Sequence, residues 1–395
     1  MGGELVVTIY INRPAYCNRW EAMRPLDFAP GIDVNSQVDR ALVSGAENID
    51  AHMHRVFYPS DDTRFWDWPN QGGTGGGQYA DPWRLWFNDD DLVCLTSLVT
   101  GGQVITLDQV FPRPWSNPRK GLPYFTNIEL DRSTSASFGG YAQTPQNSIA
   151  GAGTWGYGAD ADPAGTLAAT VDQADATITV SDGSVAGPGD LIILGYGRGS
   201  VPLPSAQGNH AGDIAPYTGE RILVTDVSAV ATGLTLSGSG VTTAEDNDQA
   251  LVTAGSGALN AGEVVTVDSE DLLVEKIIGP VATVRRAFNG STLAGHSAGA
   301  PVYAWRQWSV LRAQLGTSYL GPYNSGAPVY RHRVPQLIRD LAIAETGNQL
   351  MQEGSGYARM VGSGENAHPA PGYSLADKWA EARTAHGRKA RIRGV

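Results

Sequence analysis

Few residues of this sequence have the types and spacing that catalysis or metal binding requires. His52 and His54 lie two positions apart in a segment with helical periodicity, so they face different sides of the helix and cannot share a metal ion. The acidic run at 89–91 lacks the ligand spacing of a calcium loop, which favours a solvated turn. The glycine-rich run at 72–77 is not followed by the Lys-Ser/Thr of a phosphate loop. None of these groups predicts a site.

The common catalytic signatures are also missing from the sequence. It contains no GxSxG elbow, no HExxH pair and no Walker loop. The only cysteines, Cys17 and Cys94, are too few for a disulfide framework or a Cys-based zinc site and suit a reducing compartment. Sequence spacing does not reveal a carboxylate pair for glycoside hydrolysis. We therefore expect no enzyme, no cofactor and no metal.

Length and charge narrow the class of protein. A chain of 395 residues predicts two or three folding units. Its net charge of −12 argues against a dedicated DNA-binding surface and suits a protein that lets a polyanion pass without adhering. We expect no signal peptide and no membrane span, because the N-terminal segment has no basic region and no apolar run is long enough.

Two segments have the 3.6-residue apolar period of amphipathic helices. The first covers 33–59 and the second 332–353, where Pro335 suits the first turn and glycines follow the end. Each apolar face needs a partner, so we expect the two helices to pack on each other. The residues predicted to form this packing are Val38, Leu42, Ile49, Met53, Leu337 and Leu341.

Between these helices the composition and the hydrophobic pattern of the sequence change. Short β-type segments, typical of a β-hairpin region, follow Pro59, and from about 165 to 330 the sequence is rich in Gly, Ala, Ser, Thr and Val. Two internal repeats appear in this part. Residues 179–194 resemble 252–267, each with Gly-Asp or Gly-Glu before a strand, and 286–303 resemble 312–330, both running from Arg-Ala to Gly-Ala-Pro-Val-Tyr.

The order of the repeats predicts a nested insertion. The second module is continuous, at about 250–304, whereas the first is split into about 165–228 and 307–330. Both lie in a β-rich insertion at 159–330 that interrupts a connector core formed by 1–158 and 331–395. The expected fold class is α+β: a small helical connector core with a β-hairpin region, interrupted by a large all-β insertion of two nested modules resembling barrels or sandwiches. A fragment at about 240–306 is expected to fold alone.

The end of the chain carries the only dense cationic cluster, Arg388, Lys389, Arg391 and Arg393. A short helix that contains Trp379 is expected just before it, at 374–386. Three interpretations stay open for the cluster: a solvated tail, a nucleic-acid contact, or insertion into an acidic surface of a partner protein. Four charges on an acidic protein give little affinity for nucleic acid at physiological salt.

A set of segments outside the insertion resembles the head-to-tail connector (adaptor) proteins of long-tailed bacteriophages, especially those that infect actinobacteria. The resemblance covers about 1–158 and 331–395. The segments that carry it are INRPAYCNRWEAMRPLD, VDRALVSGAENIDAHMHRVFYP, TRFWDWP, PWRLWF, GTWGYG, VPQLIRDLAIAE, SGYARMVGSG and GRKARIRGV.

The resemblance implies a structural virion protein. Such adaptors form a ring, expected to be twelve-fold, beneath the portal, and they join the capsid to the stopper and tail while leaving a channel for DNA. The resemblance places the portal contact at Trp379, Arg388, Lys389, Arg391 and Arg393. It implies assembly in the host cytoplasm, a place in the neck of the virion, and passage of genomic DNA without sequence-specific binding.

Other classes of protein stay open. One is an extracellular carbohydrate-binding or glycan-cleaving β-protein, which the β-rich insertion and the tryptophans at 65–87 suggest. Another is a different neck component, such as a stopper or a tail terminator. The role of the insertion is not indicated by the resemblance.

Overall fold

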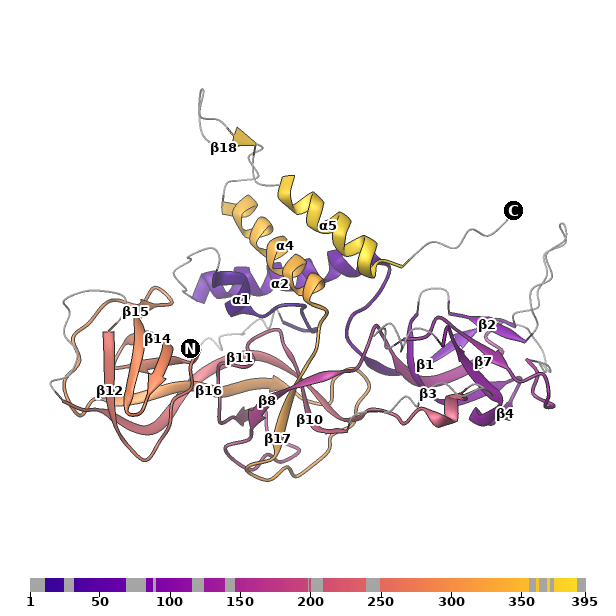
Figure 1. Cartoon of the computed structure of the whole chain (residues 1–395), viewed down its shortest axis with the longest axis horizontal. Helices are drawn as coiled ribbons and strands as arrows, with labels where there is room; N and C mark the ends of the chain where they lie inside the picture. The colour runs from indigo at the N-terminus through magenta and orange to yellow at the C-terminus, as the bar shows by residue number, and fades with distance from the viewer. Residues whose placement is uncertain are drawn as a thin grey trace, which may run out of the picture.

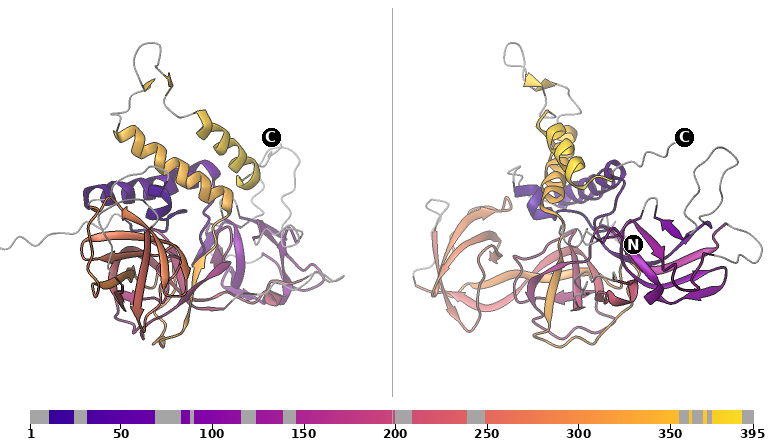
Figure 2. Two further views of the ribbon diagram at one scale, coloured as in Figure 1. Left: turned by 60° about the vertical axis from the view of Figure 1, so that its left-hand side comes forward. Right: turned by 45° about the vertical axis from the view of Figure 1, so that its right-hand side comes forward.

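The computed structural model describes residues 11–24, 32–68, 83–87, 90–115, 124–138, 146–197, 199, 209–238, 249–354, 360–361, 368–369 and 373–388. Three β units lie in a row, and a layer of helices covers one side of that row (Figure 1). The same arrangement is visible after rotation (Figure 2).

The helical layer contains α1 (Arg19–Met23), α2 (Ile32–Met53), α4 (Gln336–Gly354) and α5 (Tyr373–His386). Asn18 and Glu21 form a capping box that starts α1. The apolar stripe of α2 is fully buried against α1, α4 and α5, and so is Leu341 on α4. Leu337, in contrast, is only half-buried, and Ile338 takes the buried position on α4. The buried side chains of α2 are Val38, Ala41, Leu42, Ala46, Ile49 and Met53.

The first β unit follows α2 and consists of two antiparallel sheets. One has the order β1 (Ser60–Trp66), β7 (Ile149–Trp155), β3 (Leu92–Thr100) and β4 (Gln103–Ile105). The other has the order β2 (Arg84–Trp86), β6 (Asn127–Leu130) and β5 (Val110–Arg113). Gly153 is required where β7 pairs with β3, because a Cβ there would lie 2.3 Å from the carbonyl oxygen of Cys94.

The outer barrel, at the far end of the row, has six strands. They are β12 (Gln249–Gly255), β13 (Val264–Val267), β14 (Glu270–Ile278), β15 (Val281–Phe288) and parts of β11 (Thr218–Leu236) and β16 (Pro301–Leu311). Their order is β11-β12-β15-β14-β13-β16, and pairing of β16 with β11 closes the barrel. Alternate side chains, such as Val265, Val274 and Val284, fill the interior.

The inner barrel, in the middle of the row, uses the other ends of the same two long strands. Its order is β8 (Ala161–Thr166), β17 (Pro328–His332), β10 (Leu191–Gly197), β11, β16 and β9 (Thr177–Thr179). A bridge between Leu167 and Val180 joins its two edges. The pairing of β11 with β16 shifts register between 228 and 234, where the two strands pass from one barrel to the other.

Both barrels contain the same pair of buried ionic contacts. Glu270 accepts hydrogen bonds from Arg286 at 2.6 and 2.7 Å, and Glu220 accepts equivalent bonds from Arg312 at 2.7 Å. In each Arg-Ala pair, the alanine has a left-handed backbone, with φ of 49° at Ala287 and 52° at Ala313. The Arg-Ala repeat in the sequence therefore marks a turn folded around a buried glutamate.

The Gly-Asp and Gly-Glu repeats mark the second contact. Arg331 donates to Asp190 at 2.8 Å, and Arg306 donates to Glu263 at 2.7 Å. Each carboxylate also accepts the backbone N–H three residues earlier, at 2.9 Å in the inner barrel and 2.8 Å in the outer barrel. Two carboxylate–arginine pairs thus occupy equivalent places in both barrels.

The predicted fold class is wrong. The structure is mostly β, with 41% of the residues in strands and 21% in helices. It does not show the small helical core that was expected. Only four α-helices occur in the described part of the chain, alongside a six-stranded barrel and further sheets. The error arose because two long helices give strong periodic signals, whereas short glycine-interrupted strands give weak ones.

The remaining elements are short. They are η2 (Leu107–Gln109), η3 (Ala211–Asp213), β18 (Met360–Val361) and β19 (His368–Pro369). Ala211 in η3 packs into the apolar core of the first β unit, so a loop of the inner barrel closes that unit from the side.

Candidate functional site

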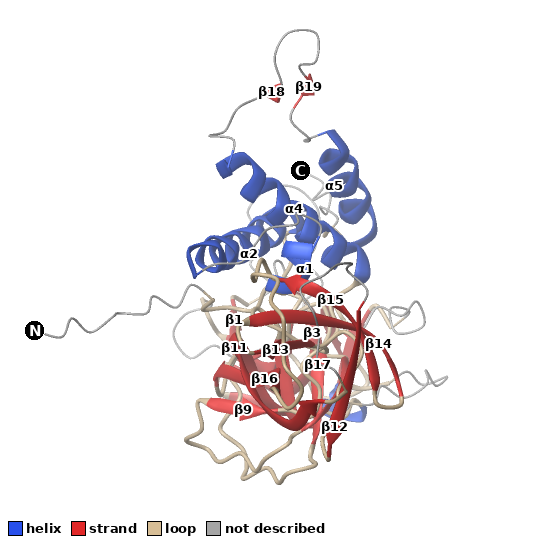
Figure 3. Ribbon diagram, turned by 90° about the vertical axis from the view of Figure 1, so that its left-hand side faces the viewer, coloured by secondary structure: helices blue, strands red, loops and turns tan. Residues whose placement is uncertain are grey.

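The C-terminal helix α5 lies on the outside of the helical layer and packs through one face (Figure 3). Ala382 is buried, and Trp379 is half-buried. The Trp379 indole donates to Glu345 at 3.4 Å, and its ring lies 4.8 Å from that of His52. The exposed face includes Lys378, Glu381 and Arg383. Trp379 therefore helps to hold α5 on its neighbours, and the free face presents charged side chains.

Arg388, the first residue of the predicted basic cluster, is held within the molecule. Its backbone N–H donates to the carbonyl oxygen of Met53 at 3.0 Å. Its guanidinium donates to the carbonyl oxygen of Phe87 at 2.9 Å and to the Asp91 carboxylate at 2.6 Å. These contacts attach the start of the tail where α2 meets the first β unit.

Arg55 completes this anchor. Its Nε lies 2.6 Å from Asp91, and its Nη1 donates to the carbonyl oxygen of His386 at 2.6 Å. The guanidinium also lies 4.5 Å from the ring centre of Tyr124 and 5.1 Å from that of Tyr157. Burial raises the pKa of Asp91, and the two arginines oppose that rise. Asp91 is thus a buried carboxylate between two guanidinium groups.

The sequence interpretation missed this anchor. The sequence predicts a solvated acidic turn at Asp91, but its side chain is only 2% exposed. Its partners are 36 residues before it and 297 residues after it, so no local spacing could have revealed them. The other cationic residues of the predicted portal contact, Lys389, Arg391 and Arg393, lie outside the described residues.

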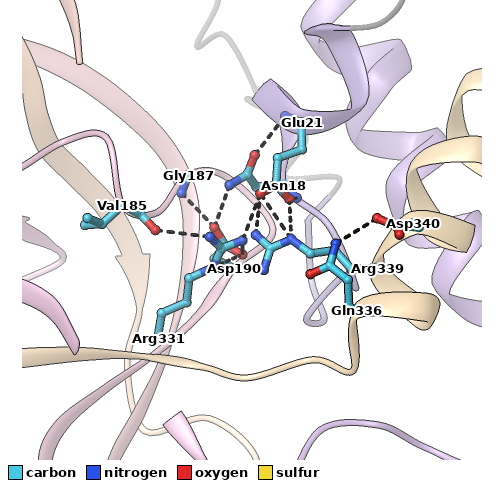
Figure 4. Close-up of polar contacts among 9 residues, drawn as sticks. All are labelled: Asn18, Glu21, Val185, Gly187, Asp190, Arg331, Gln336, Arg339 and Asp340. Atoms are coloured by element: carbon cyan, nitrogen blue, oxygen red, sulfur yellow. Dashed lines mark hydrogen bonds and ion pairs between the residues drawn. The ribbon is translucent and has the colours of Figure 1, made fainter. Parts of the chain in front are cut away.

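A second ionic cluster fixes the helical layer on the inner barrel (Figure 4). The Asp190 carboxylate accepts hydrogen bonds from the Asn18 side chain at 2.8 Å, from the Gly187 backbone at 2.9 Å and from Arg331 at 2.8 Å. Burial raises the pKa of Asp190 to about 6. This carboxylate therefore joins the cap of α1 to two strands of the barrel.

Glu21 extends the same cluster to α4. Arg339 donates to it from Nε at 3.0 and 3.1 Å, and Arg331 lies 3.4 Å away. Removal of Glu21 would leave two half-buried guanidinium groups, those of Arg331 and Arg339, with one fewer acceptor. The cluster ties α1, α4 and β17 into one unit.

The described residues form structural contacts at both ionic clusters. Within the described ranges, no group of three or more His, Cys, Asp or Glu side chains could hold a metal ion. Cys17 and Cys94 are buried and free, and burial raises the pKa of the Cys17 thiol well above its usual range. Trp66 packs its ring 5.2 Å from that of Phe87, inside the first β unit.

Comparison of the chain with protein-family models, curated proteins and solved structures finds no significant match. Among the described residues, no helix has the length and apolar character needed to cross a membrane.

Proposed function

We propose that this chain is a structural head-tail connector (adaptor) of a bacteriophage virion. One observation carries the proposal: segments that resemble adaptors lie on both sides of the insertion, and they meet in one apolar cluster. Tyr16, Phe57, Tyr157 and Leu341 come from four such segments and are all buried there. The Phe57 ring lies 5.5 Å from Tyr16 and 5.1 Å from Tyr157.

In this proposal the exposed face of α5 and the tail beyond Arg388 contact the portal. The charges available to the portal are then Lys389, Arg391 and Arg393, because Arg388 is used in the anchor at Asp91. Trp379 contributes by holding α5 in place. Copies form a ring in the neck of the virion, the stopper binds the opposite side, and DNA passes through the lumen.

The decisive experiment mixes the purified protein with the portal and examines the complex by electron microscopy. We expect a ring of copies on the portal. Folded protein that does not bind the portal would reject the adaptor proposal. Binding to a tail-tube or stopper protein instead would identify a different neck component.

Two variants separate the tail contact from the anchor. Truncation after Arg388 removes the distal charges and keeps the anchor, so we expect at least roughly tenfold weaker portal binding with unchanged stability. Arg388→Ala keeps the distal charges and should lower the stability of the α5 attachment. Unchanged portal binding after the truncation would show that the tail does not contact the portal, as expected of a solvated tail.

A further inference from the structure

A cleft of about 550 Å³ lies between α1 and the outer barrel. A cavity of this size holds a drug-sized molecule, or a few side chains of a protein. Its lining combines apolar and aromatic side chains with arginines, and it comes from segments far apart in the chain. The lining residues that matter here are Trp20, Arg24, Leu273, Arg285, Phe288 and Trp305.

Two arginines of the cleft carry positive charge that no described side chain pairs. Its other charged side chains, Glu21 and Arg286, are paired with Arg339 and Glu270. Arg24 and Arg285 are exposed, and neither side chain has a hydrogen-bond or ion-pair partner in the described part of the chain. Two guanidinium groups that no described side chain pairs, in a cleft that aromatic side chains also line, favour an occupant with a carboxylate beside apolar side chains.

The chain itself presents such a group on the inner barrel. The acidic knob consists of 171–176 and 317–323, which are joined by a bridge between Val171 and Tyr323. Tyr319 is 53% exposed and Leu320 is 43% exposed. Asp172 is also exposed, and its carbonyl oxygen accepts a hydrogen bond at 2.7 Å from Arg312, whose guanidinium lies 6.0 Å from the ring centre of Tyr319.

The knob and the cleft are different surfaces of the molecule. The loop that leads into β17 lies on the side of the barrels away from the helices, whereas α1 lies on the helical side (Figure 1). A contact between such surfaces on two copies is heterologous, and heterologous contacts generate rings when the rotation closes.

We propose that the cleft receives the acidic knob of a second copy of this chain. In this contact Asp172 pairs with Arg24 and Arg285, and Tyr319 and Leu320 pack against the aromatic side chains of the cleft. The inference rests on the proposed ring, because it names one contact between neighbouring copies in it.

Charge reversal tests this contact directly. The cleft variant carries Arg24→Glu with Arg285→Glu, and the knob variant carries Asp172→Lys. Each variant alone places like charges at the contact, so we expect its self-association at low salt to weaken at least tenfold in sedimentation velocity. Mixed in equal amounts, the two variants offer only complementary contacts when they alternate, and association should return.

Lys276→Glu is the matched control, because Lys276 is an exposed base on the outer barrel that does not line the cleft. It should associate like the wild type. Circular dichroism establishes that each variant is folded. The proposal is overturned if wild type stays monomeric at every concentration, if either reversed variant associates like wild type, or if mixing restores nothing.

The same variants on the portal distinguish this inference from the proposed function. Complete rings formed by the reversed variants would reject the knob-and-cleft contact and leave the adaptor proposal intact. Failure of the wild-type protein to bind the portal would reject the adaptor proposal. The mixing experiment would still show whether the knob of one copy binds the cleft of another.

Discussion

The buried carboxylate–arginine pairs limit which substitutions each barrel tolerates. Glu270 is fully buried and accepts hydrogen bonds from Arg286, from two backbone N–H groups and from a histidine. Burial opposes ionisation of this carboxyl, but these hydrogen bonds lower its pKa to about 2. The bond from Arg286 lowers the pKa most. An ionised glutamate is therefore the form that the turn requires.

We expect Glu270→Gln to lower the free energy of unfolding of the outer barrel by about 3–5 kcal/mol, because it leaves the Arg286 guanidinium buried without its counter-charge. Denaturant unfolding measures the loss. The control is Asp162→Asn, which removes an exposed ion pair with Arg333 and should cost less than about 1 kcal/mol. Equal losses for both variants would contradict the expectation.

The two thiols should be inert in the folded protein. Cys17 and Cys94 are each 1% exposed. A thiol reagent such as Ellman's reagent reaches neither thiolate without opening of the structure, so we expect two reactive thiols in denaturant and none under native conditions. Rapid native labelling would show that the apolar cores around them open frequently.

At the scale of elements, periodicity located the long helices but not their ends. The apolar period predicts the first helix within 33–59, and α2 ends at Met53 because His54 has a left-handed backbone with φ of 51°. Val56, which lies beyond this end, is 38% exposed. Strand register depends on partners distant in sequence, so the two sheets of the first β unit could not be predicted.

His332 makes the joint between β17 and α4 sensitive to acid. Its Nε2–H donates to the carbonyl oxygen of Phe57 at 2.8 Å, and burial lowers its pKa from 6.5 to about 4. Between pH 6.5 and 4 the imidazole is protonated in the unfolded chain but neutral in the folded chain. The free energy of unfolding therefore falls as the pH drops towards 4. The loss approaches about 3 kcal/mol.

A pH series of denaturant unfolding measures this effect. His332→Asn should lack the part of the acid dependence between pH 6.5 and 4, whereas His54→Gln at an exposed position should retain it. Parallel pH profiles for wild type and His332→Asn would contradict the assignment.

At the scale of the whole molecule, the repeats predict that the second module is nested within the first. The structure shows which residues form the apolar cluster of each barrel. One cluster draws on 164–227 and 308–329, and the other on 234–304. The repeat of Arg-Ala pairs was visible in the sequence because it marks a local turn. The contacts of those arginines with glutamates were not, since Glu220 and Arg312 are 92 residues apart.

The barrels predict different fates for two fragments. A fragment at 228–306 keeps the end of β11, which pairs with both β12 and β16, and we expect it to unfold cooperatively. A fragment at 240–306, which the repeats alone predict to fold, lacks that strand and leaves two open edges in a barrel of six strands. The structure reverses that expectation, and we expect this fragment to be unfolded or aggregated. Circular dichroism and thermal melting distinguish the two, and equal stability would show that the shared strand is dispensable.

The two strands that run through both barrels also have a mechanical consequence. A flexible linker between domains lets them swing, but here β11 and β16 cross the junction paired with each other. The outer barrel cannot swivel without stretching or breaking that ladder, so it acts as a stiff strut of the inner barrel. A load applied to its far end passes along these two paired strands into the inner barrel, which the helical layer covers (Figure 1).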